Sequence, residues 1–421
     1  MERPLSPVWH PFTQHALQPV MTKIASAKGA WLTAADGARI FDAISSWWVI
    51  THGHNFAPIV EAIQKQAAAL DQVIFAGFTH EPAEEAARRL LSITPPGLAH
   101  VFFSDSGSTS VEVALKMALG AFRNRGEPRS RIAALEHGYH GDTIGCMSVG
   151  ARGVFNAPYE PLLFEVERIP FPRPDAEQIT LDAFEALCRR DPPAALILEP
   201  LILGAGGMLI YRASVLRELK RLCEAFGVLF IADEVMTGFG RTGTPFACEQ
   251  ADISPDIMCL AKGLTGGAIP LAVTLCKSEI FEAHYSLDRA RMFYHSSSYT
   301  ANPIACAAAV ANLNVWAKEP VRERVAALTA SQSARLESLQ TDPRFENVRQ
   351  LGTITAVDFK VEEAGYLAAV GPKLYDFFQG RGLLLRPRGN TIYVMPPYCA
   401  MPEELDAVYG AIAEAAGVIG F

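Results

Sequence analysis

The sequence lacks a paired-cysteine motif, a long apolar run and an excess of positive charge. Its eight cysteines are scattered without any C-x-x-C pair, which is typical of thiols in a reducing compartment. Apolar stretches such as residues 194–198 and 201–203 are interrupted by Glu199 and by glycines, so none is long enough to cross a bilayer. The formal net charge of -8 argues against nucleic acid, because phosphate binding needs clustered positive charge.

The first ten residues also lack the basic and apolar regions of a secretory signal. These absences together predict a soluble, cytoplasmic protein with neither a membrane nor a nucleic acid as partner. Small molecules remain as the expected ligands.

The chain contains ample material for a large core. It has 421 residues, of which 50% are hydrophobic and 19% charged, so we expect one large α/β domain with smaller lobes. Residues 194–198 form an apolar run, residues 214–226 carry apolar side chains at helical spacing up to Gly227, and residues 228–232 form a second apolar run. A strand, a helix and a strand with continuous apolar runs predict a mostly parallel sheet covered on both faces.

The C-terminal part has a different pattern. A long helical pattern runs from about residue 301 into the 330s, and short strands are expected around residues 352–359 and 391–394. We therefore predict a large domain over residues 46–315. A small α/β domain would comprise residues 316–421 and the N-terminal segment 1–45.

Two charged residues follow apolar runs in the middle of the chain. Asp233 ends one run and opens the glycine-rich stretch D-E-V-M-T-G-F-G-R-T-G, and Lys262 follows the next run in A-K-G-L-T-G-G. Parallel sheets bind ligands at the carboxyl ends of their strands, so both side chains are expected at one site. Burial of an amine lowers its pKa and frees its lone pair for covalent chemistry. The acid and the amine could thus hold opposite ends of one planar cofactor.

Two further stretches could contact such a cofactor. Residues 104–110 form a small-residue loop before a helical pattern, and backbone N–H groups at a helix start bind anions; Gly107 and Ser108 are the expected phosphate contacts. Tyr139 lies between glycines and could stack on a planar ring. His137 and His140 flank it, but no third ligand has suitable spacing, so no metal site is expected.

Taken together, these motifs resemble those of the class III (ω-type) aminotransferases of PLP fold type I, over nearly the whole chain. The resemblance implies pyridoxal 5'-phosphate (PLP) as cofactor and a seven-stranded, mostly parallel sheet in the large domain. It also implies a Schiff base at Lys262, Asp233 at the pyridine nitrogen, Tyr139 on the ring, and Gly107 and Ser108 at the phosphate. In the motif H-S-S-S-Y-T-A-N-P, Ser298 would reach the phosphate of the partner subunit in a homodimer.

Within that family, the chain is most similar to the enzymes that aminate 8-amino-7-oxononanoate in biotin synthesis. Trp47 and Trp48 are expected to line the substrate pocket, because a long apolar substrate needs an aromatic wall. Arg386 is the candidate for the carboxylate of the keto acid, with the adjacent Arg388 as the alternative, and Tyr139 is expected to contact the substrate as well as the cofactor ring. Phe12 stands where the family often carries tyrosine, on the side where the amino donor binds.

Several functional alternatives stay open from the sequence. S-adenosylmethionine is the expected amino donor, but Phe12 leaves lysine as an alternative. Another ω-amino-acid aminotransferase, or a racemase or decarboxylase of the same fold, would share these motifs. A non-enzymatic binding protein is the least compatible with the combination of Lys262, Asp233 and Tyr139.

Overall fold

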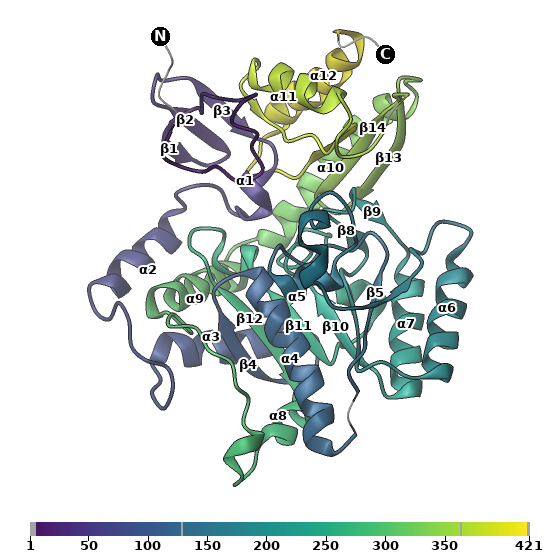
Figure 1. The fold of residues 1–421 in the computed structure, drawn as a ribbon. Coiled ribbons are helices and arrows are strands. Elements are labelled where there is room, and N and C mark those ends of the chain that lie inside the picture. Colours follow the sequence, from purple (N-terminus) through teal and green to yellow (C-terminus); the bar gives the residue numbers. More distant parts are fainter. Residues whose placement is uncertain (1–5, 128, 363, 419–421) are drawn as a thin grey trace.

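The computed structural model describes residues 6–127, 129–362 and 364–418. A seven-stranded sheet forms the centre of the large lower lobe in Figure 1. Its strands lie in the order β4 (Leu98–Ser104), β12 (Ala272–Lys277), β11 (Ile257–Leu260), β10 (Leu229–Asp233), β7 (Ala195–Leu198), β5 (Ile132–Leu135) and β6 (Glu167–Ile169). Only β12 runs antiparallel to its neighbours, so the expected mostly parallel, seven-stranded sheet is confirmed.

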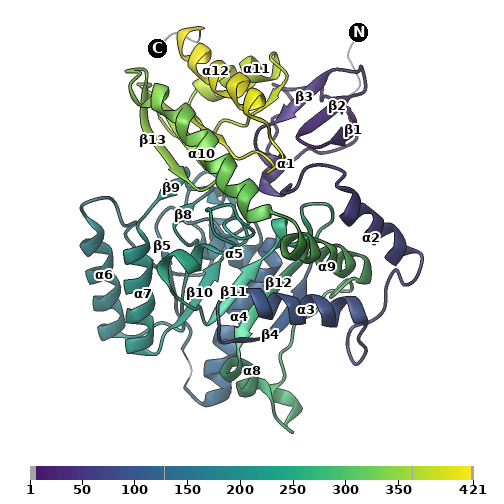
Figure 2. The ribbon, with the colours of Figure 1, turned by 180° about the vertical axis from the view of Figure 1, so that it is seen from behind.

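Helices cover both faces of this sheet, because the side chains of its strands alternate between two apolar layers. Phe230 and Ala232 pack with α6 (Glu177–Arg190) and α7 (Ala213–Phe226), whereas Leu229 and Ile231 pack with α4 (Gly107–Arg125). Helices α3 (Glu81–Ile93) and α9 (Pro303–Lys318) pack over the strands at the other end, β4, β11 and β12 (Figure 2). The start of α7 was predicted within one residue, and Gly227 ends it in the left-handed conformation at φ 62°.

The upper lobe combines segments from both ends of the chain, which lie side by side in Figures 1 and 2. One sheet holds β1 (Ile24–Lys28), β2 (Trp31–Ala34), β3 (Arg39–Asp42) and β15 (Leu383–Leu384); the other holds β13 (Phe345–Leu351), β14 (Ile354–Phe359) and β16 (Thr391–Val394). Helices α10 (Val321–Gln340), α11 (Val370–Gln379) and α12 (Pro402–Val418) complete the lobe. Because β15 pairs with β3, the two terminal segments share a core.

The single long helix expected from residue 301 into the 330s is wrong in one respect. The structure has two helices, α9 and α10, separated at Glu319 and Pro320. Proline disfavours the helical conformation of the residue before it. Glu319 precedes Pro320 and is extended at φ -106° and ψ 157°. The domain boundaries after residues 45 and 315 stay predictions; the second lies within α9.

In the described part of the chain, no helix is long and apolar enough to cross a membrane.

Candidate active site

Two neighbouring parallel strands, β10 and β11, end at the same edge of the large sheet. Asp233 is the last residue of β10 and lies in register with Cys259 of β11. Lys262 comes shortly after the end of β11 and has a positive φ of 45°, which non-glycine residues rarely adopt. The strand ends therefore bring the carboxylate and the amine to one cavity, which both side chains line.

This cavity, here called the inner cavity, has a volume of about 430 Å³. Its lining includes all five residues that the sequence assigned to the cofactor within one subunit: Gly107, Ser108, Tyr139, Asp233 and Lys262. These residues come from four separate parts of the chain. The fold thus gathers them around a space of the size that small-molecule cofactors occupy.

The amine of Lys262 has no hydrogen-bonding or ion-pair partner among the described residues. Its Nζ lies 4.8 Å from the centre of the Trp48 ring. Burial lowers the pKa of Lys262 to about 8, and the negative charges of Asp233 and Glu199 only partly offset that effect. The neutral form, which attacks a carbonyl carbon, is therefore far more abundant near neutral pH than in an ordinary lysine.

Asp233 is buried and firmly held. Its Oδ2 lies 2.7 Å from Nδ1 of His140, and its Oδ1 accepts a hydrogen bond from the backbone N–H of Val235 at 3.1 Å. The side chain of His140 is completely buried, and its Nε2 has no partner in the described structure. The sequence analysis considered His140 only as a metal ligand, since nothing in the sequence links it to an acid 93 residues away.

The start of α4 forms the small-residue end of the inner cavity. Ser106 caps the helix by accepting from the N–H of Thr109, which places Gly107 and Ser108 in the first turn. A Cβ on Gly141, which has a φ of 130°, would lie 2.1 Å from Oγ of Ser108. Glycine is thus required at 141 for the loop to approach the helix start. The exposed N–H groups of this first turn suit an anion such as a phosphate.

Tyr139 and Glu199 form a polar wall beside the amine. The Tyr139 hydroxyl donates to Oδ1 of Asp142 at 2.9 Å. The backbone N–H of Tyr139 donates to Oε1 of Glu199 at 3.0 Å. Glu199 is buried after the end of β7, and burial raises its pKa to about 7. Burial also raises the pKa of Tyr139, so its hydroxyl keeps its proton. The sequence analysis did not identify Glu199 or Asp142 as part of the site.

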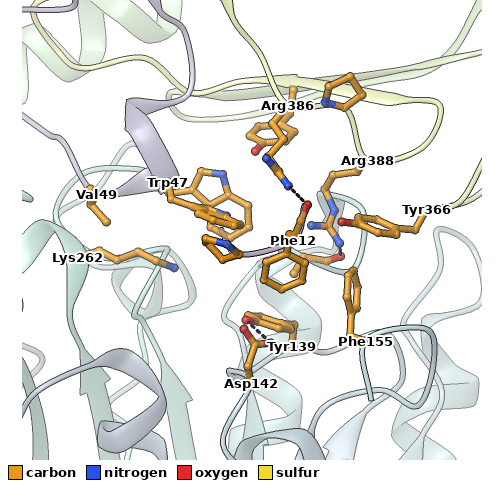
Figure 3. Close-up of a pocket in the computed structure, with 15 residues that line it drawn as sticks. Phe12, Trp47, Val49, Tyr139, Asp142, Phe155, Lys262, Tyr366, Arg386 and Arg388 are labelled. Atoms are coloured by element: carbon orange, nitrogen blue, oxygen red, sulfur yellow. Dashed lines mark hydrogen bonds between the residues drawn. The ribbon is translucent and has the colours of Figure 1, made fainter. Parts of the chain in front are cut away.

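A second cavity of about 370 Å³, here called the outer cavity, is also lined by Lys262 (Figure 3). It shares Trp48, Val49, Tyr139 and Lys262 with the inner cavity. Its other lining residues are Pro11, Phe12, Trp47, Asp142, Phe155, Ala205, Tyr366, Arg386, Pro387, Arg388 and Tyr393. Lys262 therefore lines both a polar, small-residue space and an aromatic one.

The five residues that the sequence assigned to substrate, Phe12, Trp47, Trp48, Tyr139 and Arg386, all line this outer cavity. Phe12 packs edge-on against Trp47 at 5.5 Å. The Arg386 guanidinium lies 5.2 Å from the Trp47 ring centre and donates to the carbonyl of Phe12 at 2.9 Å. Trp48 is 4% exposed and belongs to the core as well as the cavity, whereas Trp47 is 40% exposed.

The tryptophan pair lies on a turn of unusual backbone geometry. Ser45, Ser46 and Trp48 all have positive φ values. The turn is held by the fully buried Asp42, which accepts from the N–H and the hydroxyl of Ser46 at 2.7 and 2.9 Å. Strained backbone of this kind persists only where its surroundings enforce it. Asp42 is thus a supporting residue that the sequence analysis missed.

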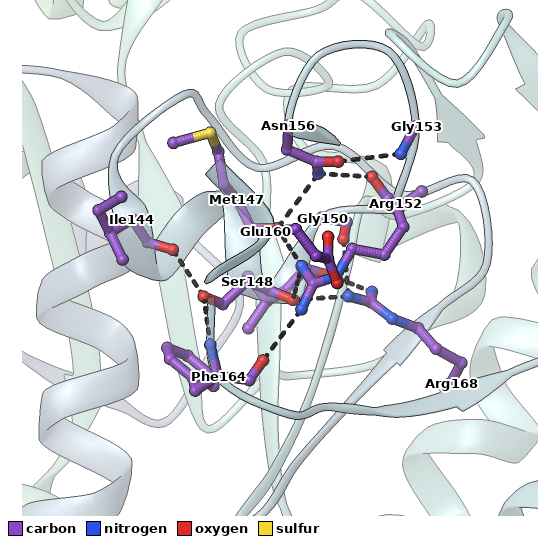
Figure 4. A network of polar contacts seen from close by, with 12 residues as sticks. Ile144, Met147, Ser148, Gly150, Arg152, Gly153, Asn156, Glu160, Phe164 and Arg168 are labelled. Carbon is purple, nitrogen blue, oxygen red and sulfur yellow. Dashed lines mark hydrogen bonds and ion pairs between the residues drawn. The ribbon is translucent and has the colours of Figure 1, made fainter. Parts of the chain in front are cut away.

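Two arginines hold the loop that carries Phe155 into the outer cavity (Figure 4). Arg168 donates to the carbonyls of Ser148, Val149 and Gly150. Arg152 donates to the carbonyls of Met147, Ser148 and Phe164. Both cap the end of α5 (Ile144–Val149), where unpaired carbonyls attract cations.

Ser298 lies apart from both cavities. It is exposed, and its carbonyl accepts from Nε2 of Gln72 at 2.6 Å. The structure therefore does not bring Ser298 together with the other predicted site residues of the same chain. Within the described ranges, no group of three or more histidine, cysteine or acidic side chains could hold a metal.

Comparison with known proteins places these features in a family. Residues 12–416 match the family model "Aminotransferase class-III". The chain is 49% identical to an adenosylmethionine-8-amino-7-oxononanoate aminotransferase from Synechococcus elongatus, with 97% of each chain covered.

Two solved structures are similar over nearly the full length. One is the adenosylmethionine-8-amino-7-oxononanoate aminotransferase of Methanocaldococcus jannaschii, with a TM-score of 0.93, 32% identity, and 98% of this chain and 97% of that chain covered. The other is a PLP-bound amine transaminase from an uncultivated Pseudomonas species, with a TM-score of 0.91, 32% identity and 99% of each chain covered. This chain belongs to the class III aminotransferases, which are PLP-dependent enzymes.

Proposed function

We propose that this enzyme transfers an amino group to 8-amino-7-oxononanoate, giving 7,8-diaminononanoate in biotin synthesis, with S-adenosylmethionine as the donor. The observation that carries the proposal is the position of Lys262. Its amine has a lowered pKa and lines both cavities. The aromatic and arginine-lined outer cavity matches an acceptor with an apolar chain and a carboxylate. The relatives named for this reaction support the assignment.

The residues of the inner cavity fit PLP. The partnerless amine of Lys262 suits a covalent bond to the cofactor aldehyde, and the first turn of α4 suits the phosphate. Asp233 suits a protonated pyridine nitrogen, since His140 orients its carboxylate. When bound, PLP supplies an electron sink that stabilises negative charge at the substrate carbon.

Each protein residue then has a distinct task. With PLP bound, the free amine of Lys262 would take the proton from the donor carbon, and in the second half-reaction its ammonium form would deliver a proton to the acceptor carbon. Asp233 would hold a proton on the ring nitrogen. Tyr139, whose hydroxyl keeps its proton, would stack on the cofactor ring, and the indole of Trp48 would keep water from the amine. Arg386 binds a substrate carboxylate.

We also propose that the enzyme works as a homodimer in the cytoplasm, with Ser298 completing the phosphate site of the partner. Exposed apolar side chains support an interface there: Ile74 and Phe78 on one segment, and Tyr294 and Tyr299 on another. Asn302 links the two segments by donating to the carbonyl of Asp71 at 3.0 Å. A cluster of exposed apolar side chains of this kind favours protein–protein contact.

A half-reaction experiment tests the proposed substrates. The PLP-loaded enzyme is mixed with S-adenosylmethionine or with lysine, and the change in cofactor absorbance is followed by stopped flow. We expect S-adenosylmethionine to convert the cofactor to its amine form, and 8-amino-7-oxononanoate to reverse the change. Conversion by lysine alone would reassign the donor, because Phe12 lacks the hydroxyl common at that position.

The acceptor is tested in the second half of the same experiment. Failure of 8-amino-7-oxononanoate to restore the original absorbance, with restoration by another ketone or aldehyde, would indicate a different ω-aminotransferase. Lys262→Ala serves as the control and should show neither change. Continued turnover of one amino acid without any acceptor would indicate a racemase or decarboxylase.

A further inference from the structure

A second guanidinium, that of Arg388, faces the outer cavity alongside Arg386 (Figure 3). It lies between two aromatic rings, 5.6 Å from the centre of Phe155 and 5.5 Å from that of Tyr366. Its side chain donates one hydrogen bond within the described structure, to the carbonyl oxygen of Ala205. No described carboxylate forms an ion pair with it.

A cation in this position lacks most of its usual stabilisation. The Arg388 side chain is largely buried, and burial lowers its pKa below the usual arginine range. A guanidinium has five N–H donors and remains charged, so a single carbonyl leaves donors that face the cavity. A buried charge without an anion is unfavourable, whereas a bidentate carboxylate would offset that cost.

The surroundings hold this guanidinium in a fixed place. Arg388 and Thr391 exchange backbone hydrogen bonds of 2.9 and 3.2 Å across a tight turn. Gly389 in that turn has a φ of 66°, and a Cβ there would lie 1.7 Å from the carbonyl oxygen of Gly365. Phe155 is on the loop fixed by Arg152 and Arg168, so the aromatic slot exists before any ligand arrives.

The two arginines are not equivalent. Arg386 stacks on Trp47 and donates a hydrogen bond to the carbonyl oxygen of Phe12. Arg388 lies across the outer cavity from Lys262, with Trp47 and Phe12 between them in Figure 3. An α-amino acid donor carries its carboxylate on the reacting carbon. In 8-amino-7-oxononanoate, five methylene groups separate the carboxylate from the reacting ketone, so its carboxylate must bind far from Lys262.

We propose that Arg388, rather than Arg386, binds the terminal carboxylate of the long-chain acceptor in the outer cavity, which leaves Arg386 for the carboxylate of the amino donor. This inference rests on the proposed acceptor. It makes Arg388 a determinant of acceptor specificity that the donor does not use.

The test separates the two half-reactions in Arg388→Met and Arg388→Lys, because methionine removes the charge and lysine keeps it. We expect Arg388→Met to raise the acceptor concentration for half-maximal rate roughly 10- to 100-fold, the range for loss of a charged hydrogen bond. Arg388→Lys should recover part of that loss. The donor step should stay near its wild-type rate in both. Arg381→Met, which removes a surface guanidinium paired with Glu414, is the matched control.

A second acceptor makes the assignment independent of folding effects. An aminoketone of the same chain length that ends in a methyl group lacks only the carboxylate. It should bind the wild type roughly 10- to 100-fold more weakly than the natural acceptor, whereas Arg388→Met should scarcely distinguish the two.

Equal discrimination between the two acceptors by the wild type and Arg388→Met would overturn the inference, as would parallel losses in the donor and acceptor steps. If Arg388→Met does not fold, Arg388→Lys and Arg388→Gln are compared with the same pair of acceptors, and an unchanged ratio in both variants would equally count against it. A wild type that ignores 8-amino-7-oxononanoate altogether would instead contradict the proposed function.

Discussion

At the scale of single residues, the chemistry depends on how the protein alters ordinary side chains. Asp233 and Lys262 could be predicted because each follows an apolar run and precedes a glycine-rich loop. Their partners could not. His140 lies 93 residues before its partner Asp233, and Glu199 lies 60 residues after its partner Tyr139, so only the folded chain brings each pair together. A sequence pattern shows neighbours along the chain, whereas electrostatic partners are neighbours in space.

The lowered pKa of Lys262 predicts how the cofactor-free protein captures PLP as pH changes. Only the neutral amine attacks the cofactor aldehyde, so the rate should rise with pH to a plateau, with its midpoint near pH 8, whereas the midpoint for an exposed lysine would lie near 10.5. Absorbance after rapid mixing measures this rate. Since Asp233 raises the Lys262 pKa, Asp233→Asn should move the midpoint to lower pH. A midpoint near 10 in the wild type would contradict the assigned environment.

The contact between His140 and Asp233 predicts that Asp233→Ala lowers kcat more than His140→Ala does. Asp233→Ala should lower kcat roughly 10²- to 10³-fold, as for other fixed electrostatic partners. His140→Ala leaves the carboxylate but removes its 2.7 Å partner, so a smaller effect is expected, a rise of about 1–3 kcal/mol in the barrier. Steady-state kinetics with the natural substrates would measure both. Equal losses would indicate that His140 does more than orient the acid.

At the scale of elements, the strands and the end of α7 followed from hydrophobic period and from glycine, because burial on both faces leaves a strong pattern. The break between α9 and α10 was missed, although Pro320 marks it, because apolar spacing continues through the proline. The turn of Trp47 and Trp48 was beyond prediction. Its positive φ values depend on Asp42 and therefore on tertiary contacts.

Asp42 should consequently be needed for both stability and substrate binding. Asp42→Ala leaves the N–H and hydroxyl of Ser46 without their buried acceptor and removes the partner of His54 Nε2, at 2.8 Å. The free energy of unfolding should fall by roughly 1–3 kcal/mol per unsatisfied group, measured by urea denaturation. Asp36→Ala, in an exposed turn, is the control and should change it by less than about 1 kcal/mol. A stable Asp42→Ala with unchanged KM would show that the turn needs no such support.

At the scale of the whole molecule, the upper lobe joins strands from both ends of the chain. The tryptophan pair lies on α1 (Ser45–Trp48), which follows β3 of that lobe in the chain. The outer cavity lies where these parts meet, since Phe12, Tyr366 and Arg386 come from the terminal segments and Lys262 from the large sheet. Substrate binding thus depends on the packing of both lobes. Composition and motifs indicate the parts of this arrangement, but not how they meet.

The proposed dimer can be tested by mixing two inactive variants. Lys262→Ala lacks the covalent lysine, and Ser298→Asp should repel the partner's phosphate by its negative charge. In a mixed dimer, one site combines both changes, while the other combines an intact Lys262 with an intact Ser298. Unfolding and refolding the two proteins together should therefore restore activity that neither shows alone.

If Ser298 instead served its own subunit, each site of the mixed dimer would carry one defect and the mixture would stay inactive. Ser296→Asp, two residues away and equally exposed, is the matched control and should bind PLP without help. Sedimentation of the wild type over a range of concentrations would establish whether a dimer forms at all. A monomer with full activity would reject the shared site, because the phosphate would then be held by Gly107 and Ser108 without a partner.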